Sequence, residues 1–326
     1  MQAKLTAIGT HVPDRVIDNH YFEGIIDTSD EWIQSRTGIR ERRYTKPNEY
    51  TSHIAEQAIR NMADNYGKDL SDIDYIIFAT VSHDHIMPSM AAVMQHRFEL
   101  AQAAAIDISA ACAGFGYGIN LAKALIESGM HRKVLVVGAE TLSKITDFND
   151  RTSCVLFGDG AGAVLIEAAE ESNIGQGVNG AEGKYGQDLY ISTRSTMVNG
   201  EFVNASGKIY QNGRKVFKWA VSRMAEQIGV LLEKNQMTVD DIDWFIPHSA
   251  NMRIIEAICK TTGIPIEKAL ESISVYGNTS SASIPLAWQL GLEAGKIKKG
   301  DKLLILGFGG GLAYAGNIIE WAGGEL

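Results

Sequence analysis

Cys112 is the side chain of this sequence best suited to covalent chemistry. It stands among small residues, where an apolar run gives way to an alanine-rich helical pattern. At a helix start, unpaired N–H groups and the helix dipole should favour the thiolate and lower the pKa of the thiol. The thiolate is the reactive form, so the pattern predicts a nucleophile. The alternative is a small buried hydrophobic residue, the role that we assign to Cys154 and Cys259.

Two further residues could act with this thiol. His248 directly follows the apolar residues 244–247, and the carboxyl ends of buried strands are where α/β sheets present functional groups. Taken alone, it could equally be a structural hydrogen-bonding residue. Asn278 follows Gly277, which on its own indicates an ordinary turn. A thiol, an imidazole and a carboxamide at corresponding places in the chain together favour a shared site.

Internal repeats indicate how distant residues could meet. Residues 71–78 resemble residues 240–247, with an offset of 169 from Asp72 to Asp241. Residues 133–138 resemble residues 302–307 at the same offset of 169, from Gly138 to Gly307. For residues 162–167 and 315–320 the offset is 153, from Glu167 to Glu320, so the first half should carry a longer excursion around residues 141–157.

The repeats predict an α/β protein made of two similar halves. Continuous apolar stretches at residues 134–137 and 303–306 are typical of strands in sheets that are covered on both faces. Two such halves would stack as five layers, α/β/α/β/α. Polar residues 168–175 mark the break, giving units of residues 1–170, with the cysteine, and 171–326, with the histidine and asparagine. Under the shared offset of 169, Cys112 falls close to Asn278, which is 166 residues further on, so two helix starts should meet near the middle.

Composition narrows the class of protein. The 326 residues carry a net charge of -9, which disfavours general nucleic-acid binding. Three cysteines without a Cys-x-x-Cys pair indicate neither a disulfide framework nor a zinc site, and they suit a reducing cytoplasm. The N-terminus lacks the apolar region of a signal peptide, and glycines 309–311 interrupt the longest weakly charged run, so we expect no membrane segment. His83 and His85 lack a third ligand pattern, so we expect no metal.

Taken together, these residues resemble the β-ketoacyl-[acyl carrier protein] synthase III family, the initiating condensing enzymes of bacterial fatty-acid synthesis. The resemblance covers nearly the whole chain. It is carried by Ser-Asp-Glu-Trp-Ile-Gln-Ser-Arg-Thr-Gly-Ile-Arg at residues 29–40, Cys112, His-Ser-Ala-Asn at 248–251, Gly-Asn at 277–278 and Phe-Gly-Gly-Gly at 308–311. The resemblance implies the thiolase fold, a homodimer, and no metal or redox cofactor.

Other enzymes of the thiolase fold fit less well. Thiolases carry a second reactive cysteine just before the C-terminal glycine run, where this chain has Phe308. Elongating synthases use two histidines, whereas this chain has Asn278 in the second position. Plant-type polyketide synthases share the cysteine, histidine and asparagine but are longer. The initiating synthase therefore fits best.

The resemblance implies a reaction in two halves. Cys112 would take the acyl group of an acyl-CoA primer, with the backbone N–H groups of Cys112 and Gly310 stabilising the oxyanion. Malonyl-[acyl carrier protein] would then lose carbon dioxide while His248 and Asn278 donate hydrogen bonds to its thioester oxygen, giving 3-oxoacyl-[acyl carrier protein]. Two alternatives are an acyltransferase or thioesterase that forms no carbon–carbon bond, and a non-catalytic acyl-CoA-binding subunit.

Substrate-binding residues also follow from the resemblance. It implies a CoA site formed by Trp32, Arg36, Thr37, Arg151 and Asn251. Trp32 would stack on the adenine and Arg151 would reach the phosphates, although ordinary packing is the alternative for Trp32. Because acyl carrier protein is acidic, its docking surface should be locally basic. The candidates are Arg214, Lys215, Lys218, Arg253 and Lys260, for which a solvated face is the alternative.

This chain departs from the family pattern at two places. Ser249 replaces the usual glutamine after the histidine, so a contact beside His248 must differ, and the chain could be a divergent second copy in its host. Met87 replaces an aromatic residue that crosses the dimer to the partner's acyl pocket. Methionine is flexible, so we expect tolerance of primers bulkier than acetyl, including branched ones. The predicted acyl pocket comprises Met87, Leu142, Phe157 and Leu189.

Overall fold

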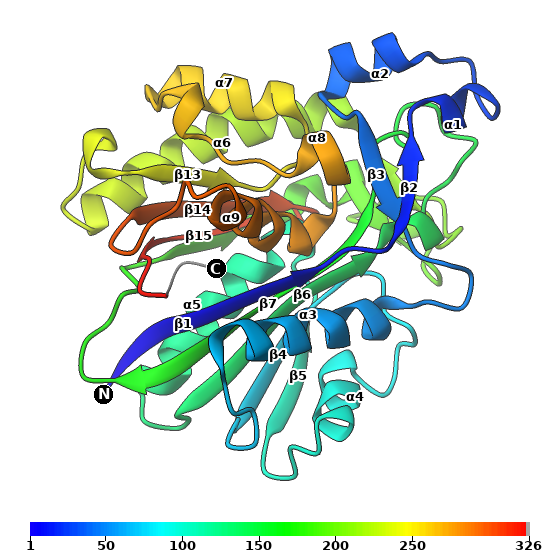
Figure 1. Cartoon of the computed structure of the whole chain (residues 1–326). Coiled ribbons are helices and arrows are strands. Elements are labelled where there is room, and N and C mark those ends of the chain that lie inside the picture. The colour runs from blue at the N-terminus through cyan, green and yellow to red at the C-terminus, as the bar shows by residue number, and fades with distance from the viewer. Residues whose placement is uncertain (324–326) are drawn as a thin grey trace.

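Two β-sheets, one from each half of the chain, lie on either side of a central layer of helices in the computed structural model (Figure 1). The structure describes residues 1–323. In spatial order, the first sheet contains β1 (Gln2–His11), β7 (Asp159–Ala169), β6 (Lys133–Thr141), β4 (Tyr75–Ala79) and β5 (Ala104–Ile108). The second sheet contains β8 (Val178–Ala181), β15 (Ala313–Glu320), β14 (Lys302–Gly309) and β13 (Trp244–Pro247).

The two sheets are connected in the same way. In each, the first strand of the half pairs antiparallel with the last strand, and the last strand pairs antiparallel with the strand before it. In the first sheet β4 pairs parallel with β5 and β6, and in the second β13 pairs parallel with β14. Ala269 forms a parallel bridge with Phe245 of β13, in the place that β5 takes beside β4. The predicted duplication is therefore present in the topology.

Helices cover both faces of each sheet (Figure 1). The outer helices are α3 (Thr51–Tyr66) and α4 (Met90–Arg97) on the first sheet, and α6 (Gly213–Lys234) and α7 (Met252–Thr262) on the second; α5 (Gly114–Glu127) and α9 (Ser283–Glu293) lie between the sheets. In β6, Val134 and Val136 pack into the central core. Leu135 and Val137 pack against the outer helices. This alternation confirms strands buried on both faces and the predicted five layers.

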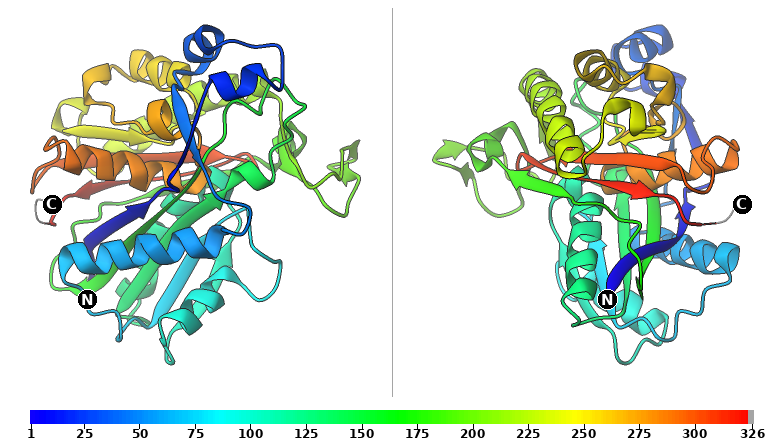
Figure 2. Two further views of the ribbon diagram at one scale, coloured as in Figure 1. Left: turned by 45° about the vertical axis from the view of Figure 1, so that its right-hand side comes forward. Right: turned by 90° about the vertical axis from the view of Figure 1, so that its left-hand side faces the viewer.

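Shorter elements extend from the layers. Between β1 and α3 lie β2 (Arg15–Asp18), α1 (His20–Glu23), α2 (Asp30–Thr37) and β3 (Glu41–Tyr44). Between β8 and α6 lie η3 (Gly183–Asp188), β9 (Leu189–Ile191), β10 (Met197–Val198), β11 (Glu201–Phe202) and β12 (Ile209–Gln211), and part of this segment projects from the body (Figure 2). The second half also contains η4 (Val239–Asp241), η5 (Ile266–Lys268) and α8 (Ile273–Tyr276). Among residues 1–323, no helix is both long and apolar enough to cross a membrane.

The longer excursion predicted for the first half is confirmed. Residues 142–158, which include η2 (Leu142–Lys144), connect β6 to β7. Residues 310–312 alone connect β14 to β15 in the second half. The first half therefore has a long loop, and the second a tight glycine turn, at corresponding ends of the two sheets.

Each half has a short 3-10 turn before its central helix. The turn η1 (Ala111–Ala113) leads into α5, and η6 (Ser280–Ala282) leads into α9. Ala111 and Ser280 both have the left-handed backbone that non-glycine residues rarely adopt, with φ of 46° and 49°. Matching these two turns makes Ser281 the counterpart of Cys112, at the same offset of 169 as the strands. The predicted offset therefore holds for the turns as well, and Asn278, expected close to the counterpart of Cys112, lies three residues before it.

A polar segment connects the halves. The side chain of Asn173 accepts a hydrogen bond from the N–H of Leu5 at 2.8 Å and donates to the Leu5 carbonyl at 2.9 Å. It also donates to the carbonyl of Glu320, whose N–H donates to the Asn173 carbonyl at 2.9 Å. Asn173 thus joins β1 of one sheet to β15 of the other. The proposed boundary between residues 170 and 171 lies just before this residue.

Candidate active site

The structure brings Cys112, His248 and Asn278 to one cavity of about 380 Å³ between the halves. The glycine run at residues 309–311 lines the same cavity and follows directly from β14. Gly310, the predicted oxyanion donor, is part of this wall. Three groups from different strand-to-helix connections therefore face a common space, as the duplicated fold requires.

Cys112 lies in η1, the 3-10 turn before α5, directly after Ala111 with its left-handed backbone. A Cβ atom added to Gly309 would lie 3.0 Å from the Cys112 sulfur and 2.9 Å from its nitrogen, so only glycine fits beside the thiol. Burial raises the pKa of Cys112 to about 12, and the Ser280 hydroxyl acts in the opposite direction. This shift is opposite to the lowering expected from the helix start, because burial disfavours the charged thiolate. The resting residue is a neutral thiol.

His248 is almost completely buried, with 1% of its surface exposed. Its Nδ1 atom lies 2.7 Å from the Ser283 hydroxyl, and its ring packs edge to face on Phe308 at 5.1 Å between centroids. Burial lowers the pKa of His248 to about 3. The imidazole is therefore neutral at ordinary pH and can donate a hydrogen bond from one ring nitrogen only.

The orientation of the Asn278 side chain is fixed by backbone contacts. Its Oδ1 atom accepts a hydrogen bond from the Ser280 N–H at 2.9 Å. Its own backbone pairs with the first half, donating to the Leu156 carbonyl at 2.8 Å and accepting from the Gly158 N–H at 2.9 Å. Because Oδ1 is occupied, the amide NH₂ group is the part left to donate into the cavity.

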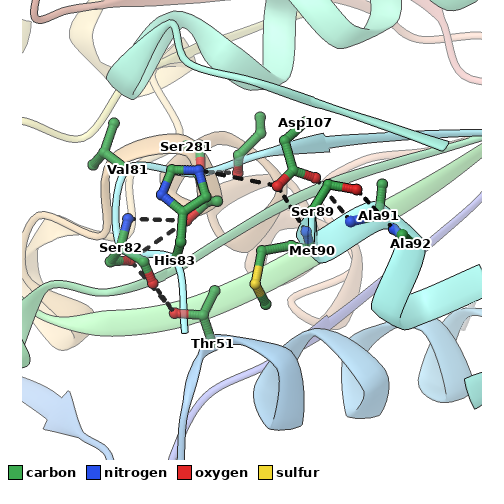
Figure 3. Close-up of polar contacts among 12 residues, drawn as sticks. Thr51, Val81, Ser82, His83, Ser89, Met90, Ala91, Ala92, Asp107 and Ser281 are labelled. Carbon is green, nitrogen blue, oxygen red and sulfur yellow. Dashed lines mark hydrogen bonds and ion pairs between the residues drawn. The ribbon is translucent and has the colours of Figure 1, made fainter. Parts of the chain in front are cut away.

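Sequence reasoning missed a histidine on the cavity wall. His83 lines the cavity together with Val81. Figure 3 shows its ring directed toward the carboxylate of Asp107 on β5, and the closest atoms are 4.0 Å apart. That carboxylate accepts hydrogen bonds from the N–H groups of Met90 and Ala91 at the start of α4. No sequence pattern separates His83 from its neighbour His85; only the fold shows which of them lines the cavity.

A second cavity of about 330 Å³ contains the predicted CoA residues Trp32, Arg36, Thr37 and Asn251. It adjoins the first, since Gln211, Val216 and Ala250 line both. Ser29 caps α2 by accepting the Trp32 N–H, and Asn251 donates to the Arg36 carbonyl at 3.1 Å. The guanidinium of Arg151 lies over the Trp32 ring, 5.0 Å from its centroid. The structure therefore gathers all five of these residues.

The predicted acyl-pocket residues divide into two groups. Leu142, Phe157 and Leu189 line the cavity that contains Cys112. Met87 lies outside that cavity and is 84% exposed. Within its own chain, Met87 cannot shape the acyl pocket.

The predicted basic residues lie on two adjacent helices. Those of α6 and α7 are Arg214, Lys215, Lys218, Arg253 and Lys260, all exposed. Lys215 pairs with Asp188 at 3.0 Å. The two helices pack on each other through one core cluster, and Val216 and Asn251 at their N-terminal ends line the second cavity. Arg214, Lys215 and Arg253 therefore lie at the helix ends next to this cavity, whereas Lys260 lies in the last turn of α7.

Within residues 1–323, no group of three or more histidine, cysteine, aspartate or glutamate side chains could hold a metal ion. His83 and His85 thus have no third partner of that kind in the described part of the chain. Cys154 and Cys259 are buried, in keeping with the packing role assigned to them.

Two family models match the chain. The model for 3-oxoacyl-[acyl-carrier-protein (ACP)] synthase III matches residues 106–183. The model for the C-terminal part of 3-oxoacyl-[acyl-carrier-protein (ACP)] synthase III matches residues 232–321. The first range contains Cys112, and the second contains His248 and Asn278.

Curated proteins and solved structures agree with this match. The chain is 51% identical over 320 residues to β-ketoacyl-[acyl-carrier-protein] synthase III 2 of Staphylococcus epidermidis, covering 98% of both chains. It is 49% identical over 321 residues to the protein of that name from Bacillus subtilis, covering 98% of this chain and 99% of the other. The crystal structure of β-ketoacyl-[acyl carrier protein] synthase III from Thermus thermophilus superposes with a TM-score of 0.94 at 42% identity. The match covers 98% of this chain and 99% of the other. The crystal structure of 3-oxoacyl-[acyl-carrier-protein] synthase III from Aquifex aeolicus superposes with a TM-score of 0.91 at 39% identity. The match covers 98% of this chain and 100% of the other.

Proposed function

The chain belongs to the β-ketoacyl-[acyl-carrier-protein] synthase III family, and from this membership we infer the roles of its individual residues. The protein is an enzyme of the thiolase fold that initiates fatty-acid synthesis by condensing an acyl-CoA with malonyl-[acyl carrier protein]. Its relatives are named as synthases, which does not favour acyl transfer or thioester hydrolysis as its main activity. One observation supports the proposed roles most directly: Cys112, His248 and Asn278 line a single cavity.

In the first half-reaction, we propose that the Cys112 sulfur attacks the thioester carbon of the acyl-CoA. The carbonyl oxygen becomes an oxyanion, which the N–H groups of Cys112 and Gly310 would stabilise; one such donor typically contributes about 3 kcal/mol. The carbon–sulfur bond to CoA then breaks. Because the resting thiol is neutral, its proton must leave with the CoA sulfur, so the products are acyl-cysteine and CoA thiol.

In the second half-reaction, malonyl-[acyl carrier protein] occupies the emptied cavity. Its carboxylate leaves as carbon dioxide, and the electron pair passes into the enolate of the thioester. His248 and Asn278, each a neutral donor in this structure, would hydrogen-bond the enolate oxygen. The enolate carbon attacks the acyl-cysteine carbonyl, and the Cys112 sulfur leaves as a thiolate, which takes up a proton from water. We propose that these steps need no cofactor.

The second cavity is suited to the nucleotide end of CoA. The Trp32 ring offers a flat apolar surface for a purine, and Arg36 and Arg151 supply positive charge for phosphates. In the resting chain the guanidinium of Arg151 lies over the indole. A purine that stacks on Trp32 must therefore displace Arg151 or insert beneath it.

We propose a homodimer for this chain, as in the family. β5 is the edge strand of the first sheet and has no partner on its outer side among residues 1–323. Ile106 on that strand is 43% exposed, and Ile86 and Met87 nearby are 73% and 84% exposed. A second copy could cover these residues and bring its Met87 to the acyl pocket. We propose the cytoplasm as the location, where three free thiols would stay reduced.

Acyl carrier protein is the proposed partner of the basic residues on α6 and α7. Replacing Arg253 with glutamate should raise the KM for malonyl-[acyl carrier protein] about 10-fold, since it reverses one charge facing an acidic partner. Acyl transfer from acyl-CoA should change less than about 2-fold. Steady-state kinetics with each substrate varied in turn would measure both effects.

The matched control is Lys299→Glu, an exposed charge reversal in the loop before β14, away from the cavity. It should leave both half-reactions unchanged. Equal loss of both half-reactions in Arg253→Glu would contradict this docking site.

The proposed primer range is tested with a panel of acyl-CoAs. Acetyl-, isobutyryl- and longer acyl-CoAs are each incubated with the protein and malonyl-[acyl carrier protein], and released carbon dioxide and 3-oxoacyl products are quantified. We expect turnover with branched and longer primers. Strict use of acetyl-CoA would contradict the role given to Met87, and acyl transfer without carbon dioxide release would favour the acyltransferase alternative.

A further inference from the structure

Three buried serines surround His248. Ser249, Ser272 and Ser283 are each completely buried, with no exposed surface. The N–H of Ser272 donates to the Ser249 hydroxyl at 3.0 Å, and the Ser272 hydroxyl donates to the Ser283 carbonyl at 3.1 Å. The N–H of Ser249 donates to the Ser283 hydroxyl oxygen at 3.2 Å. Of these contacts, only the one from the Ser249 N–H reaches the Ser283 hydroxyl, which it holds beside the imidazole.

The other hydrogen bonds of Ser283 indicate whether Ser283 or His248 donates the hydrogen in the bond between them. The Ser283 oxygen already accepts the Ser249 N–H, and within residues 1–323 its hydroxyl hydrogen has no acceptor other than Nδ1 of His248 at 2.7 Å. If Nδ1 carried the proton instead, a completely buried hydroxyl would be left without an acceptor, which typically costs about 1–3 kcal/mol. Donation from Ser283 to Nδ1 gives both the Ser283 hydroxyl hydrogen and the Nδ1 lone pair a partner.

We propose that Ser283 is a positioning residue that donates to Nδ1 of His248 and so keeps the ring proton on Nε2, the nitrogen available to the cavity. This proposal rests on the proposed role of His248 as a donor to the malonyl thioester. With its proton on Nε2, the imidazole stabilises an enolate oxygen but cannot accept the Cys112 proton. His248 then serves the second half-reaction and is not the base of the first.

The departure from the family pattern at residue 249 lies within this group of serines. A serine is short enough for its hydroxyl to accept the Ser272 N–H beside the helix start of α9. Its backbone N–H occupies one lone pair of the Ser283 oxygen, so that the hydroxyl hydrogen turns to the imidazole. The contact with Ser283 thus comes from the backbone of residue 249 and does not require a serine, and the Ser249 side chain makes no direct hydrogen bond to the ring within the described chain.

The ring proton can be located directly. We would label the histidine ring nitrogens of the full-length protein with ¹⁵N and assign His248 by comparison with the His248→Gln variant. The expected spectrum shows Nε2 protonated and Nδ1 unprotonated in the wild type. A protonated Nδ1 would overturn the proposal, and this measurement does not depend on any serine variant folding.

Two serine variants separate positioning from packing. In Ser283→Ala, the kcat for malonyl-[acyl carrier protein] decarboxylation should fall about 10- to 100-fold with little change in KM, because the lost alignment matters in the transition state. Acyl-cysteine formation should stay within about 2-fold of wild type. The matched control, Ser272→Ala, removes an equally buried hydroxyl that does not contact the ring, so decarboxylation should change little. Equal decarboxylation rates in the two variants would overturn the proposal.

His248→Gln distinguishes this proposal from the proposed function. If that variant decarboxylates malonyl-[acyl carrier protein] at the wild-type rate, the assigned role of His248 is wrong. The proton position measured in the wild type would still test the Ser283 hydrogen bond by itself. Slow decarboxylation in His248→Gln with wild-type rates in Ser283→Ala would instead leave the role of His248 intact and overturn that of Ser283.

Discussion

No acyl group should remain on the Cys112→Ala variant after incubation with an acyl-CoA, whereas the wild type should gain the mass of one acyl group per chain. Condensation should fall by about 10⁴-fold or more, as expected when a covalent nucleophile is removed. Decarboxylation of malonyl-[acyl carrier protein] should persist, because His248 and Asn278 line the cavity from the other half. Intact-mass spectrometry and carbon dioxide release would measure the two effects separately.

The chain supplies a control for this variant. Cys259 is buried on α7, away from the cavity, so Cys259→Ala should retain the acyl adduct and the condensation rate. An adduct that persists in Cys112→Ala would contradict the assigned nucleophile. An adduct lost in both variants would point to misfolding instead of chemistry.

Replacing Gly309 with alanine should slow acyl-cysteine formation by about 10²-fold or more, because small displacements of a reacting group have effects of this size. The added Cβ would lie 2.8 Å from the Cys112 Cβ, a distance that real Cβ atoms essentially never show. It would also lie 3.0 Å from the Cys112 sulfur, which is tighter than most contacts of real Cβ atoms. The neighbours are the backbone nitrogen and the short side chain of Cys112, so the turn that holds the thiol must move. Rapid-quench measurement of acyl-cysteine formation, with thermal unfolding in parallel, would record the effect.

Gly229→Ala is the matched control. Gly229 lies in α6, and a Cβ added there meets no atom within 4 Å in the described part of the chain. Alanine in a helix interior stabilises the fold by roughly 0.5–1 kcal/mol relative to glycine, so this variant should be slightly more stable and fully active. Wild-type acylation rates in Gly309→Ala would show that the cavity wall is more pliable than its packing indicates.

The sequence predicts the layers because their signals are periodic. Apolar runs such as residues 134–137, repeated at residues 303–306, require a sheet buried on both faces, and one shared offset requires two of them. For the two central turns, the sequence predicted only an approximate match, with Cys112 close to Asn278. Small residues around Cys112 and Ser281 satisfy tight packing without a distinctive pattern, so the backbone conformation of Ala111 and Ser280 was needed to match them.

The site was predicted less completely than the fold. The motif residues indicated which groups meet, but the charge state of Cys112 depends on burial, which sequence cannot measure. His83 on the cavity wall and Ser283 beside His248 come from segments that carry no local chemical signal. Their roles depend on distances between strands and helices that are far apart in the chain.

Asn173 limits how this enzyme can open for its substrates. Its side chain and backbone bond to Leu5 and Glu320 at once, so the connection between the lobes is itself tied to both sheets. A hinge motion at this point would have to break these hydrogen bonds. We therefore expect the two halves to move as one rigid body. Conformational changes that admit substrates should be confined to the peripheral segments at residues 142–158 and 182–212. Entry and exit of the long pantetheine arm would then be gated by loop mobility, whose timescale differs from that of domain closure.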